Sequence, residues 1–282
     1  MNEKKLTVGS LFSGIGGIEL GLERTGGFET KWFCENDPYA RAVLRKHWPG
    51  IPCHPDIRGL GVSVIPEGVD MLCGGFPCQD ISTAGKRVGI KGERSGLFFE
   101  VIRLAGIIRP RYILLENVAA LAVRGLDTVL GELALCGYDA EWDCISAASV
   151  GARHRRDRLF IVAYSDGRGC AQSGISISRR SKGQAESDAG GGGPTLSDST
   201  IIGREWAGRA WSRRERFEDG CSIFGKTPRP VGGWEAESSV GRTIDGIPSR
   251  VDRLRCLGNA VVPQVAQYVG QCILDYERRG GG

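Results

Sequence analysis

The stretch Leu6-Thr7-Val8-Gly9-Ser10-Leu11-Phe12-Ser13-Gly14-Ile15-Gly16-Gly17 decides the fold of this 282-residue chain. Residues 6–12 predict a buried strand, and the spacing of Ile18, Leu20 and Leu22 predicts a helix that continues to Arg24. Glycine at the turn lets the backbone pass close to a ligand, and the start of the helix presents free N–H groups. This pattern is typical of nucleotide-binding turns. It fits a dinucleotide cofactor, S-adenosylmethionine, or tight packing without a ligand.

Strands and helices alternate along the chain beyond this turn. Asp37 as N-cap and Pro38 in the first turn mark the start of the next helix. The alternation predicts an α/β fold with a mostly parallel sheet and right-handed crossovers, and ligands then bind beyond the carboxyl ends of the strands. We expect further strands at residues 30–34, 69–73, 112–115 and 158–163, and further helices at 37–47, 97–108, up to about 136, and 263–278.

The composition is that of a globular protein with one large domain and a small second lobe. Charged residues make up 25% of the chain, and the net charge of +4 permits nucleic acid binding without requiring it. Residues 165–232 are rich in Gly, Ser and Arg and show little periodicity. They predict either a flexible insertion or a small DNA-contacting lobe, and both interpretations stay open.

The cysteines and the apolar runs argue against a zinc protein, a membrane protein and a secreted protein. None of the ten Cys forms a C-x-x-C pair and there are three His, so no zinc site is predicted. No apolar run approaches the roughly 18 residues of a membrane span, and the N-terminal residues lack the apolar stretch of a signal peptide. We expect a cytoplasmic protein with reduced thiols, no metal and no membrane association.

Three polar groups fall where strands are expected to end. Cys78 follows the third strand in a Gly-Gly-Phe-Pro-Cys-Gln turn (74–79), where positive charge or a helix N-terminus would lower the thiol pKa from about 8.5. Glu116 ends the fourth strand, where a partly buried carboxyl can stay protonated and donate a hydrogen bond. Glu35 ends the second strand, where an acid can bind ribose hydroxyls. A structural cysteine and a helix-capping acid are the alternatives for Cys78 and Glu116.

A basic cluster precedes the last predicted strand. Residues 153–158 read Arg-His-Arg-Arg-Asp-Arg, and strand alternation would place Arg156 and Arg158 on one face. A solvated basic edge and contacts with phosphates or base edges are both consistent with this pattern.

Taken together, these motifs resemble the cytosine-5 DNA methyltransferase family of bacteria and phages. The resemblance covers about residues 6–164 and 233–278. His154 departs from the family, which commonly has Gln at that position. The motifs that carry the resemblance, in order, are residues 12–17, Glu35-Asn36-Asp37, Asp56-Ile57, residues 74–79, residues 94–98, Glu116-Asn117-Val118, Arg156-Asp157-Arg158 and residues 258–263.

The resemblance implies an α/β, Rossmann-like S-adenosylmethionine-dependent methyltransferase fold with a mostly parallel sheet and a small target-recognition lobe. It divides the chain into a catalytic and cofactor-binding domain (1–164), a short Gly-rich target-recognition or linker region (165–232) and a C-terminal segment that returns to the catalytic domain (233–282). The implied activity is methylation of carbon 5 of a flipped-out cytosine through a covalent adduct with Cys78.

The resemblance also implies roles for individual residues. The catalytic residues would be Cys78, Glu116, Arg156 and Arg158. DNA would be contacted by Pro77, Gln79, Ser82 and Asn117. S-adenosylmethionine would contact Phe12, Gly14, Gly16, Glu35, Asp56, Ile57, Leu97 and Asn259.

Several alternatives and partners follow from the same motifs. The nearest alternative is the same chemistry on RNA, followed by a non-catalytic DNA-binding relative and a nicotinamide-dependent oxidoreductase. The expected partner is double-stranded DNA, with a cognate restriction endonuclease as a further partner in a restriction-modification pair. We expect the protein to be a monomer.

Overall fold

The computed structural model describes residues 4–65, 68–77, 96–165, 223–224 and 249–280. These residues form a seven-stranded sheet in the order β3-β2-β1-β4-β5-β7-β6. Its strands are β1 (Leu6–Leu11), β2 (Phe28–Cys34), β3 (Cys53–His54), β4 (Met71–Gly75), β5 (Tyr112–Val118), β6 (Tyr138–Ile145) and β7 (Arg158–Ser165).

The first five strands run parallel, as the alternation of strands and helices predicts. β1 lies between β2 and β4, and β5 follows on β4. β7 is inserted between β5 and β6 and runs antiparallel to both. The mostly parallel sheet is therefore confirmed, and its strand order reverses beside β1, as in doubly wound folds.

Two strands were not predicted from the sequence. β6 carries Asp139, Glu141 and Asp143 at alternate positions and lies at the edge of the sheet, so it lacks the continuous apolar run of a central strand. β3 has only two residues and pairs with the end of β2. Short or acidic edge strands give little periodicity to detect.

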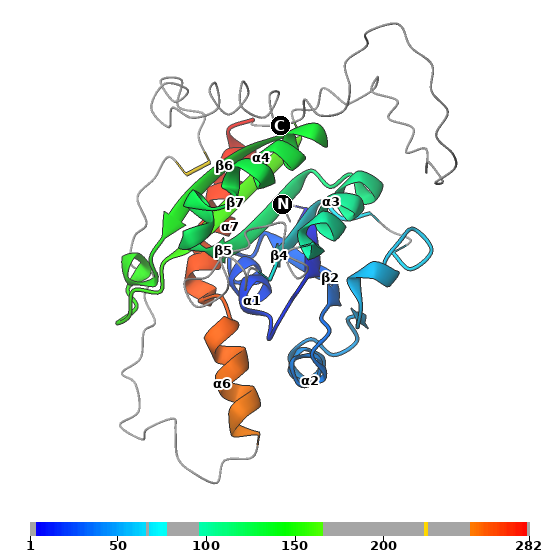
Figure 1. The fold of residues 1–282 in the computed structure, drawn as a ribbon, viewed down its shortest axis with the longest axis vertical. Coiled ribbons are helices and arrows are strands. Elements are labelled where there is room, and N and C mark those ends of the chain that lie inside the picture. Colours follow the sequence, from blue (N-terminus) through cyan, green and yellow to red (C-terminus); the bar gives the residue numbers. More distant parts are fainter. Residues whose placement is uncertain (1–3, 66–67, 78–95, 166–222, 225–248, 281–282) are drawn as a thin grey trace, which may run out of the picture.

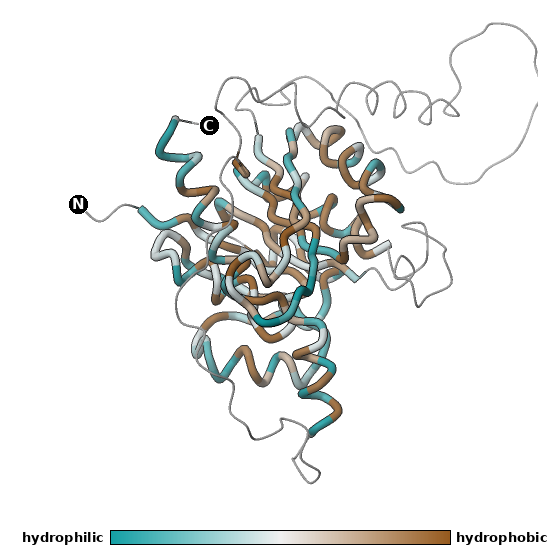
Figure 2. Tube along the Cα trace, turned by 90° about the vertical axis from the view of Figure 1, so that its left-hand side faces the viewer, coloured by the Kyte–Doolittle hydropathy of each residue, from teal (hydrophilic) through white to brown (hydrophobic). Residues whose placement is uncertain are grey.

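Helices cover both faces of the sheet, which gives three layers (Figure 1). One face is covered by α3 (Leu97–Ile108) and α4 (Leu126–Leu135), whose Phe98, Leu104 and Val129 join a core with the sheet. The opposite face is covered by α1 (Gly17–Arg24) and α7 (Pro263–Arg278). The hydrophobic segments gather in the middle of the fold (Figure 2). The bounds of α3 and α7 agree with the predicted helices.

The C-terminal helices return to the start of the chain. α6 (Arg250–Asn259) leads into α7, which packs along α1. A Cβ on Gly21 would lie 2.2 Å from the carbonyl oxygen of Pro263, and one on Gly17 would lie 2.5 Å from that of Val261. α1 therefore approaches the start of α7 and the residues just before it closely because glycine occupies both positions.

The far end of α7 is fixed to the start of β5. The Tyr112 hydroxyl donates to Oε1 of Glu277 at 2.5 Å, and Nη1 of Arg111 lies 2.8 Å from Oε2. Between residues 165 and 249, the structure describes Ile223 and Phe224. Ile223 is buried, and its N–H donates to the carboxylate of Glu141 on β6, at 3.0 Å from Oε2. The predicted domain boundaries remain predictions.

Within the described ranges, every helix is too short or too polar to cross a bilayer. The same part of the chain holds no group of three or more His, Cys, Asp or Glu side chains arranged to bind a metal ion.

Candidate active site

The glycine turn after β1 adopts a left-handed backbone at three positions. Phe12 has φ 52°, Gly14 φ 55° and Gly16 φ 84°. A Cβ on Gly16 would lie 2.5 Å from the ring of Trp48, so both the backbone angle and the available space require glycine there. Phe12 holds the same conformation without being glycine, which costs about 1–3 kcal/mol and has to be offset by the surrounding packing. Strain of this kind is common at binding sites.

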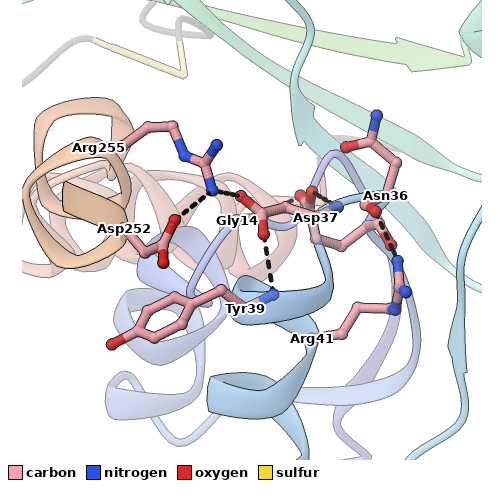
Figure 3. A network of polar contacts seen from close by, with 8 residues as sticks. Gly14, Asn36, Asp37, Tyr39, Arg41, Asp252 and Arg255 are labelled. Carbon is pink, nitrogen blue, oxygen red and sulfur yellow. Dashed lines mark hydrogen bonds and ion pairs between the residues drawn. The ribbon is translucent and has the colours of Figure 1, made fainter. Parts of the chain in front are cut away.

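Glu35 ties this turn to the end of β2. Its Oε2 accepts from the N–H of Gly14 at 2.7 Å, and its Oε1 accepts from the N–H of Asp37 at 2.8 Å. Nη1 of Arg41 donates to the carbonyl oxygens of Glu35 and Asn36 at 3.0 and 2.6 Å (Figure 3). The carboxylate predicted to bind ribose thus lies beside Gly14, and each of its oxygens keeps a lone pair that can accept a hydroxyl.

Asp37 links the end of β2 to α6. It caps α2 (Pro38–His47), because its Oδ1 accepts from the N–H of Tyr39 at 2.8 Å, as the sequence predicts. Its Oδ2 lies 2.5 Å from Nη2 of Arg255, which also contacts Asp252 at 3.0 Å (Figure 3). Helix α6, which ends at the predicted cofactor contact Asn259, is therefore held close to the glycine turn; Asn259 itself is exposed.

Asp56, Ile57 and Leu97 form a second group of predicted cofactor contacts. Asp56 caps η1 (Ile57–Gly59), a short 3-10 helix, and its Oδ1 accepts from the N–H of Arg58 at 3.0 Å. Ile57 is buried, whereas Asp56 is exposed. Leu97 is the first residue of α3 and packs partly against the core that also holds Ile57. Each of the eight predicted cofactor contacts is described by the structure.

The predicted catalytic carboxyl of Glu116 is buried in β5, with 7% of its surface exposed. In the antiparallel pairing, Arg158 on β7 lies opposite Val118, which makes it the diagonal neighbour of Glu116 on the same face. Nε of Arg158 lies 2.8 Å from Oε1 of Glu116. That oxygen is fully buried and accepts no well-aligned hydrogen bond within the described residues.

Burial controls the protonation of this carboxyl. It raises the pKa of Glu116 to about 7, and the nearby positive charges of Arg158 and Arg156 lower it only in part. At neutral pH a substantial fraction of Glu116 is therefore protonated and able to donate a hydrogen bond. This is the state that the sequence predicts for a catalytic acid at this strand end.

The turn that leads to Cys78 packs directly against Glu116. A Cβ on Gly75 would lie 2.7 Å from Oε2 of Glu116. Nδ2 of Asn117 donates to the carbonyl oxygen of Phe76 at 3.1 Å, and its Oδ1 accepts from the N–H of Val118. Asn117 is buried, so in this structure its side chain holds the turn.

Three predicted site residues, Cys78, Gln79 and Ser82, lie outside the described residues. The described part of the turn ends at Pro77, a predicted DNA contact that is partly buried. Cys78 is the next residue along the chain.

Arg156 departs from the predicted strand geometry. β7 begins at Arg158, and Arg156 precedes it with a left-handed backbone of φ 38°. Alternation along a strand therefore does not relate the two side chains. Nη2 of Arg156 donates to the carbonyl oxygens of Gly258 and Ala260, at 2.6 and 2.7 Å. Arg156 thus joins the basic loop to the last predicted motif, 102 residues or more along the chain.

A buried acid beneath the glycine turn was not predicted from the sequence. Glu19 on α1 is 1% exposed, and burial raises its pKa to about 7. Its Oε1 contacts the Ser10 hydroxyl and lies 3.6 Å from Sγ of Cys73, while Ser10 Oγ lies 2.6 Å from Ser13 Oγ. A hydroxyl has one proton to give, so a protonated Glu19 that donates to Ser10 leaves Ser10 free to donate to Ser13. The only sequence signal was an acid next to Ile18 on a helix that packs against the sheet.

The chain is similar in sequence to known methyltransferases. A family model described as C-5 cytosine-specific DNA methylase matches residues 6–198. The type II methyltransferase M2.BsuMI of Bacillus subtilis (strain 168) is 32% identical in an alignment 305 positions long, which covers 94% of this chain and 75% of that protein. The type II methyltransferase M.Bsp6I of Bacillus sp. (strain RFL6) is 37% identical over 165 residues, which cover 56% of this chain and 52% of that protein.

Among solved structures, the Entamoeba histolytica methyltransferase EhMeth superposes with a TM-score of 0.60. The match covers 97% of this chain and 99% of that one, at 16% identity, so it supports the fold alone. The chain spans three quarters of the length of M2.BsuMI but about half that of M.Bsp6I.

Proposed function

Because this chain belongs to the C-5 cytosine-specific DNA methylase family, we propose that it methylates carbon 5 of cytosine in double-stranded DNA, with S-adenosylmethionine as donor and Cys78 as nucleophile. The observation that carries the proposal is the buried carboxyl of Glu116, which lies beside Arg158 and packs against Gly75 in the turn that leads to Cys78. An acid on β5 and a guanidinium on the neighbouring strand β7 can hold a pyrimidine ring from two sides, and the residue after Pro77 is Cys78.

The proposed reaction begins with a cytosine extruded from the duplex, at a cost of a few kcal/mol. The Cys78 thiolate forms a bond to carbon 6 while Glu116 donates to the ring nitrogen, so that the ring electrons move toward carbon 5. Arg158 faces the base oxygen. Carbon 5 would take the methyl group as the methyl–sulfonium bond breaks, and the leaving group is neutral S-adenosylhomocysteine. The proton on carbon 5 then leaves to a base and the bond from carbon 6 to the Cys78 sulfur breaks, which restores the aromatic ring and the thiolate.

The residues near the glycine turn fit S-adenosylmethionine. Bound there, it would supply an electrophilic methyl group on a cationic sulfonium. Glu35 offers a carboxylate for the two ribose hydroxyls, Asp56 offers an acceptor for the adenine amine, and Leu97 and Phe12 offer apolar surface. The Cβ position of Gly14 has open space around it, which leaves room for a ligand to approach the backbone.

The same contacts argue against a nicotinamide dinucleotide. In a dinucleotide site the amides of the glycine turn receive a phosphate. Here the N–H of Gly14 donates to the carboxylate of Glu35, and Asp37 lies at the same edge. The Gly14 N–H is therefore already engaged and is not free to receive a phosphate.

A covalent trap tests the proposal. A long bacteriophage DNA amplified with 5-fluorodeoxycytidine in place of deoxycytidine presents the unknown target sequence in many copies, and fluorine at carbon 5 blocks the final elimination. We expect a denaturant-resistant protein–DNA complex that requires S-adenosylmethionine. Cys78→Ser should abolish it, while the matched control Cys144→Ser, at an exposed cysteine on β6, should leave it unchanged.

Three further measurements separate the alternatives. Methyl transfer from labelled S-adenosylmethionine to unmodified tRNA, with none to duplex DNA, would replace DNA with RNA as the substrate. Binding to DNA without an adduct or transfer in the unaltered chain would favour the non-catalytic alternative. Calorimetry that finds NAD binding and no S-adenosylmethionine binding would contradict the cofactor assignment.

We also propose how the protein works in the cell. It acts as a cytoplasmic monomer that modifies DNA beside a cognate restriction endonuclease, and residues 165–232 select the target sequence. Sedimentation with and without duplex DNA tests the monomer. Mapping of 5-methylcytosine in DNA from cells that express the protein tests the activity and reveals the sequence that a partner nuclease would cut.

A further inference from the structure

The guanidinium of Arg103 on α3 holds the short η1 turn from outside it. Nη2 donates to the carbonyl oxygen of Ile57 and Nη1 to that of Leu60, each at 3.0 Å. Nε donates to Oε2 of Glu100, one turn earlier on α3, at 2.8 Å. Each nitrogen of the planar group is therefore engaged, and Glu100 fixes the plane in which the other two nitrogens donate.

The two carbonyls lie at the two ends of η1. Ile57 begins this 3-10 helix and Leu60 follows its last residue, and the Leu60 N–H already donates to the Ile57 carbonyl oxygen at 3.1 Å. Asp56 caps the same turn through its Oδ1 and the N–H of Arg58. Rotation of the turn would break the bonds to Arg103 and move the Asp56 carboxylate together with the backbone.

Apolar packing alone does not fix this orientation. Ile57 and Leu60 are buried in one core with Phe98 and Leu104 of α3. Dispersion and hydrophobic contacts have little directional preference, whereas hydrogen bonds weaken steeply when their angles change. The core therefore sets where the turn lies, and Arg103 sets how it is rotated.

We propose that Arg103 is a positioning residue for the adenine end of the cofactor site. The inference rests on the proposed function, which makes Asp56, Ile57 and Leu97 cofactor contacts. Leu97 is the first residue of the helix that carries Arg103. One guanidinium thus fixes the turn bearing Asp56 relative to the helix bearing Leu97. The distance between these two proposed cofactor contacts is then set before the cofactor binds.

A lysine would not replace this arrangement. Its ammonium is a compact charge on a flexible stem and lacks the planar fork that reaches two carbonyls and a carboxylate together. We therefore expect Arg103→Lys to keep the charge but lose at least one of the three contacts.

The test measures adenine recognition rather than turnover. The probes are S-adenosylhomocysteine and S-inosylhomocysteine, in which an oxygen replaces the exocyclic amine, and calorimetry gives the Kd of each. The amine can donate to Asp56, whereas the oxygen is repelled by its carboxylate. Arg103→Met keeps the apolar stem and removes the donors. The matched control is Arg109→Met, at the end of the same helix, which removes a 3.1 Å bond to the Cys136 carbonyl oxygen.

We expect the unaltered chain to prefer S-adenosylhomocysteine. Arg103→Met should weaken its binding about tenfold and bring the two Kd values together, because loss of charged donors at one site is worth roughly that factor. Arg109→Met should leave both Kd values unchanged. If Arg103→Met does not fold, Arg103→Lys should show the same reduced preference.

Two results would overturn the inference. The first is an Arg103 variant with a lower Tm and an unchanged preference for adenine, and the second is an equal loss of affinity for both probes. If the unaltered chain binds neither probe, the proposed function fails, and the role of Arg103 fails with it. Failure of the proposed function is seen as a lack of probe binding by the unaltered chain. Failure of the inference alone is seen only in the Kd values of the variants.

Discussion

Nε of Arg158 lies 2.8 Å from Oε1 of Glu116, yet the pKa of that carboxyl is raised to about 7. Desolvation in the interior of the sheet outweighs the attraction of the guanidinium. The pair therefore keeps an acid that is still partly protonated at neutral pH next to a permanent cation. These are a hydrogen-bond donor and a positive charge, the two groups that a ring gaining electrons requires.

The protonation of Glu116 predicts a falling limb in the pH profile of methylation. The protonated acid is the active form, so kcat should decline as pH rises through about 7. Glu116→Gln should lose this limb and have a kcat lower by about 10²-fold or more, the usual contribution of an acid catalyst. Single-turnover rates from pH 5.5 to 9 measure both effects. An unchanged limb in the Gln variant would assign the titration to another group.

Gly75→Ala should impair methylation while leaving cofactor binding intact. The added Cβ would lie 2.7 Å from Oε2 of Glu116, so the carboxyl or the turn before Cys78 has to move. Gly106→Ala in α3 is the control: nothing lies within 4 Å of its Cβ, and alanine should stabilise that helix by about 0.5–1 kcal/mol. Rates with labelled S-adenosylmethionine and thermal melts compare the two. Equal activity in both variants would contradict the assigned role of the turn.

Glu35→Gln should weaken S-adenosylhomocysteine binding by about tenfold or more. The carboxylate accepts from two backbone amides, those of Gly14 and Asp37. A glutamine side chain has one acceptor oxygen, so one amide loses its partner and the turn loses its tie to β2. Glu29→Gln, at an exposed acid of the same strand that pairs with Lys31, should bind normally in the same calorimetric titration.

Glu19 should make stability depend on pH. Its pKa is raised from 4.5 to about 7 in the folded state, so the unfolded chain releases this proton first. The contribution to stability is then fully present below about pH 4.5 and is lost as pH rises through about 7, a change of about 3 kcal/mol. In denaturant unfolding, the free energy of unfolding of Glu19→Gln should rise relative to that of the unaltered chain as pH increases across this window. A difference between the two that stays constant with pH would refute the shift.

Much of the fold was predictable because local signals decide it. Pro263 and the spacing of Val265, Val269 and Cys272 define α7, and Asp37 caps α2 as its side chain suggests. The strand ends that carry Glu35 and Glu116 followed from the alternation of strands and helices.

The remaining features depend on contacts between distant parts of the chain. β6 was missed because acids alternate along an edge strand. Arg103 and Arg156 each donate to two backbone carbonyls, which carry no sequence signal and lie from 43 to 104 residues away. Glu19 appears as a surface acid until the packing of α1 on the sheet buries it. The position of Cys78 stays a prediction.

The packing of α7 on α1 sets an order for synthesis. Ile18 and Leu22 emerge from the ribosome long before Val265 and Val269, which share one core with them. Until those later residues have been made, the apolar face of α1 is uncovered and the glycine turn lacks its neighbour Val261. A growing chain at that stage exposes apolar surface, and the turn proposed to bind the cofactor is complete only after α7 has been made.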